Sequence, residues 1–294
     1  MNKHLAWTHA IIGAFCLTVA GPRWESGAQA PLWLGDWYPA VGLQITADDN
    51  VNRSFDGDGE KRDFIFAPTF EVERQTPIGE TTFGYLNLAV EGRIHGKYNK
   101  LNHVAPGFVT GIRHALGGPE APSVVVASVG LKYEFHDQDF RFGAEVNPRL
   151  EWQFRAGQAL RGALYYEYDN RFASENPVYD REGHTFGFDV EASVTADAAL
   201  LLGYRYRHGD VLVHQPRTDL GEEIRGRRFP LDTFRSRYDA VKIDDEDTHH
   251  VSLGLRYILS LYTSVQAGIA YEDIRAAGDS YPSMQFIFGV THLL

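Results

Sequence analysis

The strongest constraint in this sequence is a repeated two-residue alternation of apolar and charged side chains. In twelve segments one face is nearly free of charge, while the other face carries charges in most of them. Successive side chains of a β-strand point to opposite faces, so this period predicts strands with one apolar face. The segments are Trp37–Ala47, Asp63–Arg74, Thr82–His95, Ser123–Phe135, Phe140–Val146, Arg149–Trp152, Leu160–Arg171, Phe186–Val194, Leu200–Arg207, Val251–Tyr257, Val265–Glu272 and Met284–Leu294.

The last of these segments keeps its apolar alternation, through Phe286, Phe288 and Val290, up to the final residue. In a water-soluble domain such a strand is an exposed edge that invites aggregation. In a bilayer it is the closing strand of a barrel, and only helices and closed barrels satisfy every backbone group in hydrocarbon. After residue 30 no stretch approaches the ~20 continuous apolar residues of a membrane helix. The sequence therefore predicts an all-β, antiparallel, up-and-down transmembrane β-barrel of about twelve strands.

The lengths of the connections support this prediction. Membrane barrels alternate short periplasmic turns with longer external loops. With the first strand rising from the periplasm, the long connections all fall outside and the last strand ends in the periplasm. In this interpretation Asn147-Pro148 is a tight outer turn between two short strands. The long connections are 48–62, 96–122, 172–183 and 212–247, and the short ones include 75–81, 136–139, 196–198 and 260–261.

The amino-terminal segment has the features of a secretory signal peptide. Lys3 precedes an apolar run, Ala10–Ala20, which is too short to span a bilayer, and Ala28-Gln29-Ala30 forms a small-residue cleavage site. We expect a signal peptide over residues 1–30 and a barrel over residues 31–294. The only cysteine, Cys16, lies inside the signal peptide, so thiol chemistry is not expected in the barrel. The expected location is the bacterial outer membrane.

The charge balance excludes some partners. The chain has a formal net charge of −11, and residues 1–30 contribute +1 through Lys3, Arg23 and Glu25, so the remainder carries −12. Such acidity argues against nucleic-acid binding. The acidic run from Asp48 to Glu60 offers oxygen ligands for calcium but lacks the ligand spacing of an EF-hand, which favours a solvated external loop. No metal site and no cofactor are predicted.

The charged face of the strands is expected to line the lumen. Mixed charges there set the selectivity of a narrow pore, or neutralise one another in a closed barrel, and both interpretations remain open. The loop 212–247 either folds inward as a constriction or projects as a solvated surface loop, which is the default. The predicted lumen-lining residues are Glu71, Glu91, Arg93, Lys132, Glu134, Arg141, Glu145, Arg161, Glu167, Asp189, Glu191, Arg205, Arg207, Arg256 and Glu272.

An enzymatic interpretation depends on His250 and Ser252. Some outer-membrane lipid hydrolases use a His-x-Ser pair on a strand, in which the imidazole takes the serine proton and a third group orients the ring. Here the alternation places Val251 and Leu253 toward lipid, so the pair points inward, away from a lipid substrate. We therefore predict that the chain is not an enzyme.

The first predicted hairpin carries a family resemblance. Val41–Val51 ends in Asp48-Asp49-Asn50-Val51, and Lys61–Phe70 contains Asp63, apolar residues and Pro68. This pattern resembles the opening of outer-membrane β-barrel porins, some of which are associated with exopolysaccharide export. The resemblance covers about thirty residues and carries over no catalytic residue. It implies an outer-membrane barrel. The partners expected for the chain are outer-membrane lipid, lipopolysaccharide and, through the C-terminal strand, the barrel assembly machinery.

These observations together favour a narrow, porin-like channel for small solutes or for surface polysaccharide export. The alternatives are a lipid-modifying barrel enzyme of the lipid A deacylase or phospholipase type, and a closed structural or adhesion barrel that acts through its external loops.

Overall fold

The computed structural model describes most of the chain beyond residue 36. It covers residues 37–54, 60–117, 123–138, 141–216, 226–231, 234, 238–276 and 278–294, and two short paired strands, β1 (Thr8–His9) and β2 (Val19–Ala20). The rest of the expected signal peptide, including Cys16, lies outside the described residues. Among the described residues, no helix is long and apolar enough to cross a bilayer.

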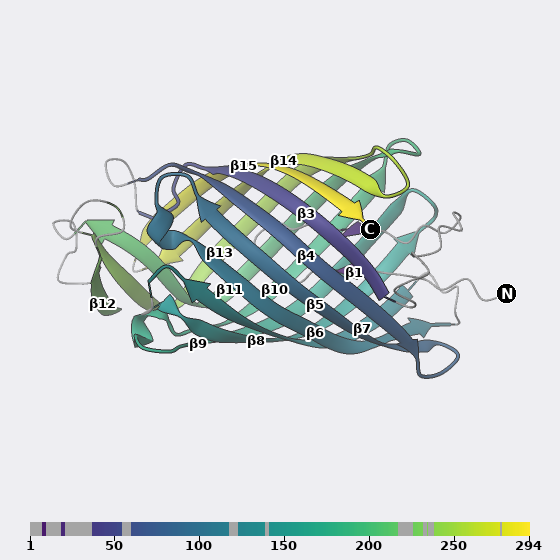
Figure 1. Cartoon of the computed structure of the whole chain (residues 1–294), viewed down its shortest axis with the longest axis horizontal. Helices are drawn as coiled ribbons and strands as arrows, with labels where there is room; N and C mark the ends of the chain where they lie inside the picture. Colours follow the sequence, from purple (N-terminus) through teal and green to yellow (C-terminus); the bar gives the residue numbers. More distant parts are fainter. Residues whose placement is uncertain are drawn as a thin grey trace.

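One antiparallel sheet contains nearly all of the remaining described residues (Figure 1). Two short 3₁₀ helices, η1 (Asn99–Leu101) and η3 (Pro177–Tyr179), lie between strands. The strands are β3 (Trp37–Asp48), β4 (Asp63–Pro77), β5 (Thr82–His95), β6 (His103–Leu116), β7 (Ser123–His136), β8 (Gly143–Ala156), β9 (Leu160–Ala173), β10 (Arg181–Ser193), β11 (Ala198–Pro216), β12 (Gly226–Leu231), β13 (Tyr238–Ile258), β14 (Thr263–Ala276) and β15 (Asp279–Leu293).

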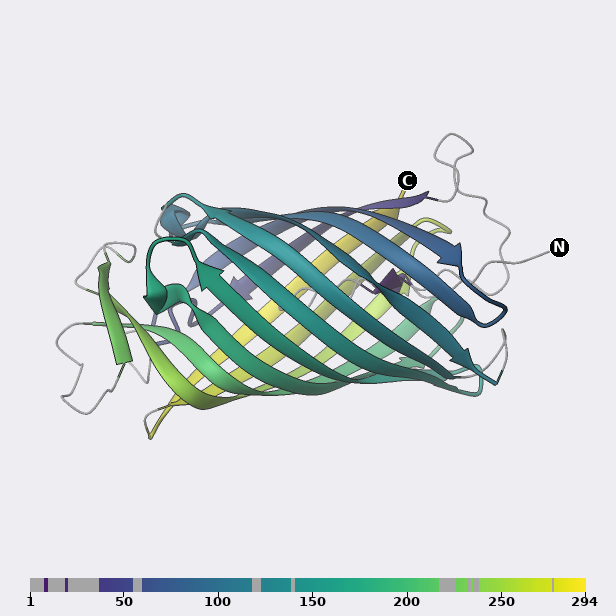
Figure 2. The ribbon, with the colours of Figure 1, turned by 90° about the horizontal axis from the view of Figure 1, so that it is seen from below.

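The sheet closes into a barrel through two pairings. β15 pairs with β3, with Val290 opposite Leu43, and β11 pairs with β13, with Leu202 opposite Leu253. In the described part of the chain β12 pairs with β13 alone, so the other twelve strands form the closed barrel. The tilted strands run up and down around the axis (Figure 2), and the prediction of an up-and-down barrel of about twelve strands is confirmed.

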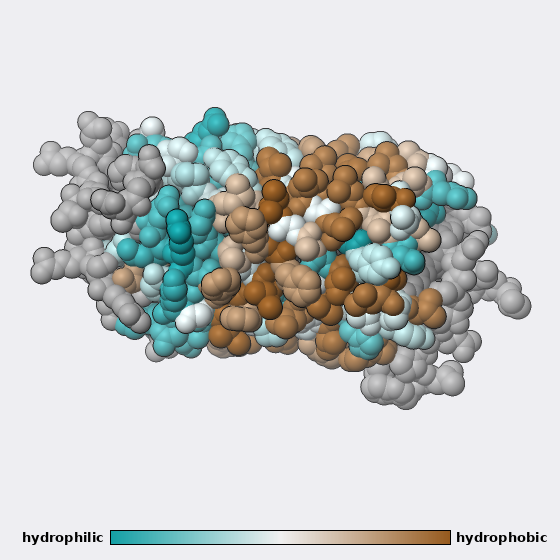
Figure 3. Space-filling view, turned by 90° about the horizontal axis from the view of Figure 1, so that it is seen from above, coloured by the Kyte–Doolittle hydropathy of each residue, from teal (hydrophilic) through white to brown (hydrophobic). Residues whose placement is uncertain are grey.

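The outward face of the barrel is apolar over the middle of the strands. Leu43, Leu88, Leu131, Leu253 and Phe288 are between 41 and 47 % exposed, although they are large and apolar. Figure 3 shows this apolar band, with hydrophilic side chains gathered toward the end that carries β12. A closed barrel with an apolar outer band is stable in a bilayer, because lipid covers the band and no strand edge is left unpaired. The barrel is therefore an outer-membrane barrel, and we call the end with β12 the outer end.

The prediction that residues 96–122 form one long loop is wrong, because β6 lies within it. The inward side chains of β6 are mostly small and uncharged, and Arg113, which pairs with Glu73 at 2.9 Å, is the exception, so the expected apolar–charged alternation is weak in its sequence. Pro106 also interrupts the pairing with β7, which is broken between Val104 and Gly107. A Cβ atom at Gly111 would lie 2.3 Å from the carbonyl oxygen of Ala127, so glycine permits a close approach of the two backbones.

The prediction of a tight turn at Asn147-Pro148 is also wrong. β8 is continuous there, with Asn147 opposite Gly130 and Pro148 opposite Val129 in β7. This error compensates for the missed β6, so the total of twelve strands stays correct. It also moves the connection between β7 and β8, which was expected to be periplasmic, to the outer end.

The third correction concerns the loop predicted over residues 212–247, much of which is strand. β11 and β13 are 19 and 21 residues long, and their pairing continues beyond the barrel wall to Pro216 and Tyr238. The register shifts between Gly209 and Val211, where Gly209 has φ +151° and Asp245 has φ +60°. Such a bulge bends both strands. We call the paired segments beyond it, residues 211–216 and 238–243, the mouth hairpin.

Candidate functional site

The side chains predicted to line the lumen are buried or half-buried, and nearly all alternate with lipid-facing residues along their strands. Arg141 is an exception to the strand prediction, because it lies in the connection before β8 and its guanidinium is 5.4 Å from the ring centre of Tyr179. The others occupy inward positions. They are Glu71, Glu91, Arg93, Lys132, Glu134, Glu145, Arg161, Glu167, Asp189, Glu191, Arg205, Arg207, Arg256 and Glu272.

One group of these charges lies across β7, β8 and β9. The Lys132 ammonium is 3.3 Å from Glu134 and 3.1 Å from Glu145. Arg171 donates to the same Glu134 carboxylate over 3.0 Å and to the carbonyl oxygen of Tyr179 over 2.6 Å. The charges therefore form a connected network along the wall.

A second group lies further around the same wall. Arg149 pairs with Glu151 at 2.5 Å and with Glu167 at 3.4 Å. Arg207 donates two hydrogen bonds to Asp169, of 3.0 and 2.8 Å. Such charge-assisted, bidentate contacts hold the side chains in fixed positions. Further pairs are Arg93 with Glu91, and both Arg161 and Arg256 with Glu191.

The opposite wall is mostly small and neutral. β14, β15 and β3 contribute one charged inward residue each at most, Glu272 on β14 and Asp48 on β3, and both lie near the outer end. The lumen therefore has a charged side, from β4 around to β13, and a neutral side formed by β14, β15 and β3. The inward residues of the neutral side are Gly42, Gln44, Thr46, Ser264, Gln266, Gly268, Ala270, Gln285, Ile287, Gly289 and Thr291.

The mouth hairpin extends across the outer opening of the barrel. Phe234, between its two strands, lies 5.0 Å from the ring of Tyr98 and packs with Tyr238 against Leu101. Tyr98 and Leu101 belong to the connection between β5 and β6, which is half the circumference away from β11 and β13 in the strand order. Residues on opposite walls touch only if one segment crosses the lumen.

Both faces of the mouth hairpin are buried. On one face Val213 and Val241, each 0 % exposed, pack with Ile274 and Tyr281 at the outer ends of β14 and β15. On the other face Ala240 packs against η3. A strand pair that is apolar on both faces is typical of a buried element. The hairpin is therefore held between the two sides of the mouth.

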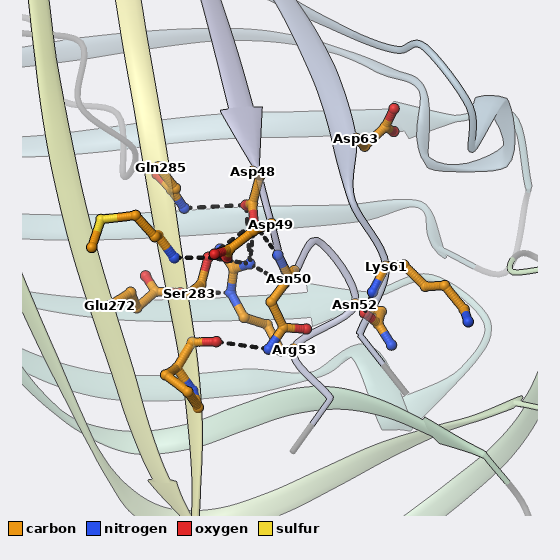
Figure 4. A network of polar contacts seen from close by, with 12 residues as sticks. Asp48, Asp49, Asn50, Asn52, Arg53, Lys61, Asp63, Glu272, Ser283 and Gln285 are labelled. Carbon is orange, nitrogen blue, oxygen red and sulfur yellow. Dashed lines mark hydrogen bonds and ion pairs between the residues drawn. The ribbon is translucent and has the colours of Figure 1, made fainter. Parts of the chain in front are cut away.

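Arg53 holds a second segment, residues 49–54 after β3, in place at the outer mouth (Figure 4). Its guanidinium is 3.0 Å from Asp48 and 2.6 Å from Glu272, and it also donates to the carbonyl oxygen of Asn50. Burial alone lowers the pKa of Arg53, but the carboxylates of Asp48 and Glu272 outweigh burial and raise that pKa above its usual value. Arg53 adopts φ +51°, so its contacts hold a backbone conformation that non-glycine residues rarely adopt.

Asn52 joins this segment to the mouth hairpin. The backbone N–H of His214 donates to the carbonyl oxygen of Asn52 over 2.9 Å, and the Asn52 side chain donates to the carbonyl oxygen of His214 over 3.2 Å. The imidazole of His214 is buried, and burial lowers its pKa to about 3. Among the described residues, neither of its ring nitrogens has a hydrogen-bond partner, so the ring is neutral.

The proposed catalytic pair faces the lumen, as its alternation predicted. His250 and Ser252 are 4 and 1 % exposed. The Ser252 hydroxyl donates to the carbonyl oxygen of Gly203 over 3.3 Å, and His250 Nδ1 is 3.7 Å from Glu272. The serine proton is therefore directed to a backbone carbonyl, which gives no support to a nucleophilic role.

The structure describes only part of the acidic run that was considered for calcium, Asp48 to Glu60. Asp48 is engaged by Arg53, Ser283 and Gln285, while Asp56 and Asp58 lie outside the described residues. Within the described ranges, no three His, Cys, Asp or Glu residues are grouped so that they could hold a metal ion.

Sequence reasoning missed the mouth hairpin, Arg53 and Asn52. The hairpin has a signal of its own: Val211-Leu212-Val213 and Ala240-Val241 are apolar on neighbouring positions, which indicates a strand buried on both faces. No comparable signal exists for Arg53, because its role depends on contacts with distant residues.

Comparison with known proteins supports the fold. No protein-family model and no curated protein matches the chain. Among solved structures, an outer-membrane channel from Pseudomonas putida F1 is similar, with a TM-score of 0.56 and 9 % identity over 92 % of this chain and 99 % of that one. The NanC porin matches with a TM-score of 0.45 and 11 % identity over 86 % of this chain and all of that one. The fold is that of an outer-membrane β-barrel.

Proposed function

We propose that this chain is a narrow outer-membrane channel whose outer mouth is closed by the mouth hairpin and opens when the hairpin moves aside. The observation that carries the proposal is the packing of Phe234 and Tyr238 against Tyr98 and Leu101, from the opposite wall. A barrel that only anchors external loops needs no segment across its lumen.

The lumen supports the passage of polar solutes. Its charged side presents fixed ion pairs, and its neutral side presents hydroxyl, amide and glycine positions. A wall of this kind replaces part of the hydration of a polar solute without binding it tightly. The cargo class that fits this lining is a small polar solute or a polysaccharide strand, and the inward charged residues then line its path.

Planar-bilayer recordings test the proposal. In one variant, a short Gly-Ser linker replaces residues 211–244 and connects Asp210 to Asp245 just beyond the barrel wall. We expect rare, brief openings of the native protein and steady conductance of the variant. As a control, the turn 78–81 at the other end is replaced by a linker in the same way, and this change should leave the openings rare.

The alternative of a permanently closed structural barrel is favoured by the same packing of the hairpin. The deletion separates the two functions, since a structural barrel whose lumen is filled by side chains stays silent without its hairpin. Absence of conductance from the folded deletion variant therefore rejects the channel.

A further inference from the structure

A cavity of about 160 Å³ opens at the periplasmic end of the barrel, on the charged side of the lumen. It is bounded by two turns, residues 157–159 between β8 and β9 and residues 194–197 between β10 and β11. Three arginines and one glutamate line it, and we call these four residues the periplasmic arginine pocket. They are Arg155, Arg161, Glu191 and Arg256.

The positive charges in this pocket outnumber the negative ones. Glu191 Oε1 accepts hydrogen bonds from both Arg161 and Arg256, so one carboxylate serves two guanidinium groups. The other carboxylate that lines the cavity, Asp197, is exposed on a turn. In a chain of net charge −11, this is a local excess of positive charge.

The arrangement of the arginines costs stability. Arg155 and Arg161 are directly opposite each other in the β8–β9 pairing. Like charges in directly opposed positions destabilise an antiparallel pair. An anion bound between the arginines would relieve this repulsion.

The frame of the pocket is rigid. The Ser193 N–H donates to the carbonyl oxygen of Ala159 over 2.7 Å, which joins the two turns. The Ile258 N–H donates to the carbonyl oxygen of Asp197 over 2.8 Å, and the Thr195 hydroxyl accepts from the Ala198 N–H over 3.0 Å. A ligand that enters a preformed site pays little to order it.

We propose that the periplasmic arginine pocket binds an oxyanion, namely the carboxylate or phosphate group of a solute that moves through the barrel. Guanidinium groups match the geometry of both oxyanions with paired N–H donors. The proposal rests on the channel function, and it makes the pocket the last binding station before the periplasm, which favours anionic over neutral cargo.

Calorimetric titration of the refolded protein with inorganic phosphate tests the binding directly. The native protein should bind phosphate. The double variant Arg155→Gln and Arg161→Gln should bind phosphate at least about tenfold more weakly, because charge-assisted hydrogen bonds are lost. Arg74→Gln is the matched control. Arg74 lies at the same end but outside the barrel, 5.6 Å from the ring of Trp37, and its loss should leave binding unchanged.

A second test records currents through the variant that lacks the mouth hairpin, in a salt gradient across the bilayer. The reversal potential should shift toward cation selectivity in the double variant and stay in place in Arg74→Gln. Equal phosphate binding by the native protein and the double variant, or no binding by either, overturns the proposed site, whether or not the channel conducts. Binding that the double variant loses, in a barrel that never conducts, supports the site and rejects the channel.

Discussion

We predict that closure of the outer mouth depends on pH through the neutral His214. Its ring is 7 % exposed, lies 5.3 Å from the ring of Phe234, and belongs to the mouth hairpin. Burial, and to a smaller extent Arg141, lower its pKa from 6.5 to about 3. When the hairpin moves aside, the ring meets water and its pKa returns toward 6.5. Acid therefore favours the open state.

The size of the effect follows from the two pKa values. The contribution of His214 to closure is fully present above pH 6.5 and is lost as the pH falls from 6.5 toward 3. At pH 5 the exposed ring is almost fully protonated and the buried ring is not. This difference favours opening by roughly 30-fold, or about 2 kcal/mol, since one pKa unit corresponds to ~1.4 kcal/mol.

Planar-bilayer recordings at pH 7.5 and pH 5 measure this shift as a change in open probability. His214→Phe is the matched variant, because phenylalanine keeps the ring beside Phe234 and cannot take a proton. The native protein should open about 30-fold more often at pH 5, and the variant should lack that increment. An equal response of both proteins to acid, or fewer openings of the native protein in acid, refutes the reasoning.

Three further predictions concern stability, each measured by urea unfolding in lipid vesicles and the heat-dependent gel shift of the barrel. Arg53→Ala leaves the carboxylates of Asp48 and Glu272 without their cation and should lower the free energy of unfolding by about 3 kcal/mol. Arg53→Gly should lower it by less, since glycine accepts φ +51°. Equal losses of stability in the two variants contradict this account. Gly111→Val places side-chain atoms against the carbonyl oxygen of Ala127 and should abolish folding, whereas Val109→Ala on the same face should be tolerated. Leu131→Arg, on the lipid face of β7, should cost about 2–4 kcal/mol and Leu131→Phe very little; an unchanged unfolding curve for Leu131→Arg would place that face outside the bilayer.

The alternation of side chains predicted the barrel and the inward faces well, because the two-residue period is a direct consequence of strand geometry. It failed where a strand lacks contrast between its faces. β6 carries Ala105, Gly107 and Gly111 inward, and Arg113 is its single inward charged residue, so the contrast between its two faces is weak. In β8, Pro148 is a residue typical of turns, although a strand tolerates proline at a position whose backbone nitrogen forms no ladder hydrogen bond.

The outer mouth was beyond prediction for a different reason. Whether residues 211–216 project or fold inward depends on the bulge at Gly209 and on partners such as Leu101 and Ile274 that are remote in sequence. No local pattern encodes those contacts. The alternation marks inward positions for most of the predicted lumenal charges but gives no sign of Arg113, and the pairing of these charges depends on strand register, which the missed β6 and the divided β8 shifted.

The most direct test of a channel closed by its own hairpin is a comparison of single-channel conductance between the native protein and the variant in which a linker replaces residues 211–244. The account predicts rare openings of the native protein and steady conductance of the variant, with both folded as judged by the gel shift. A folded variant that remains silent, or a native protein that conducts as steadily as the variant, would contradict it.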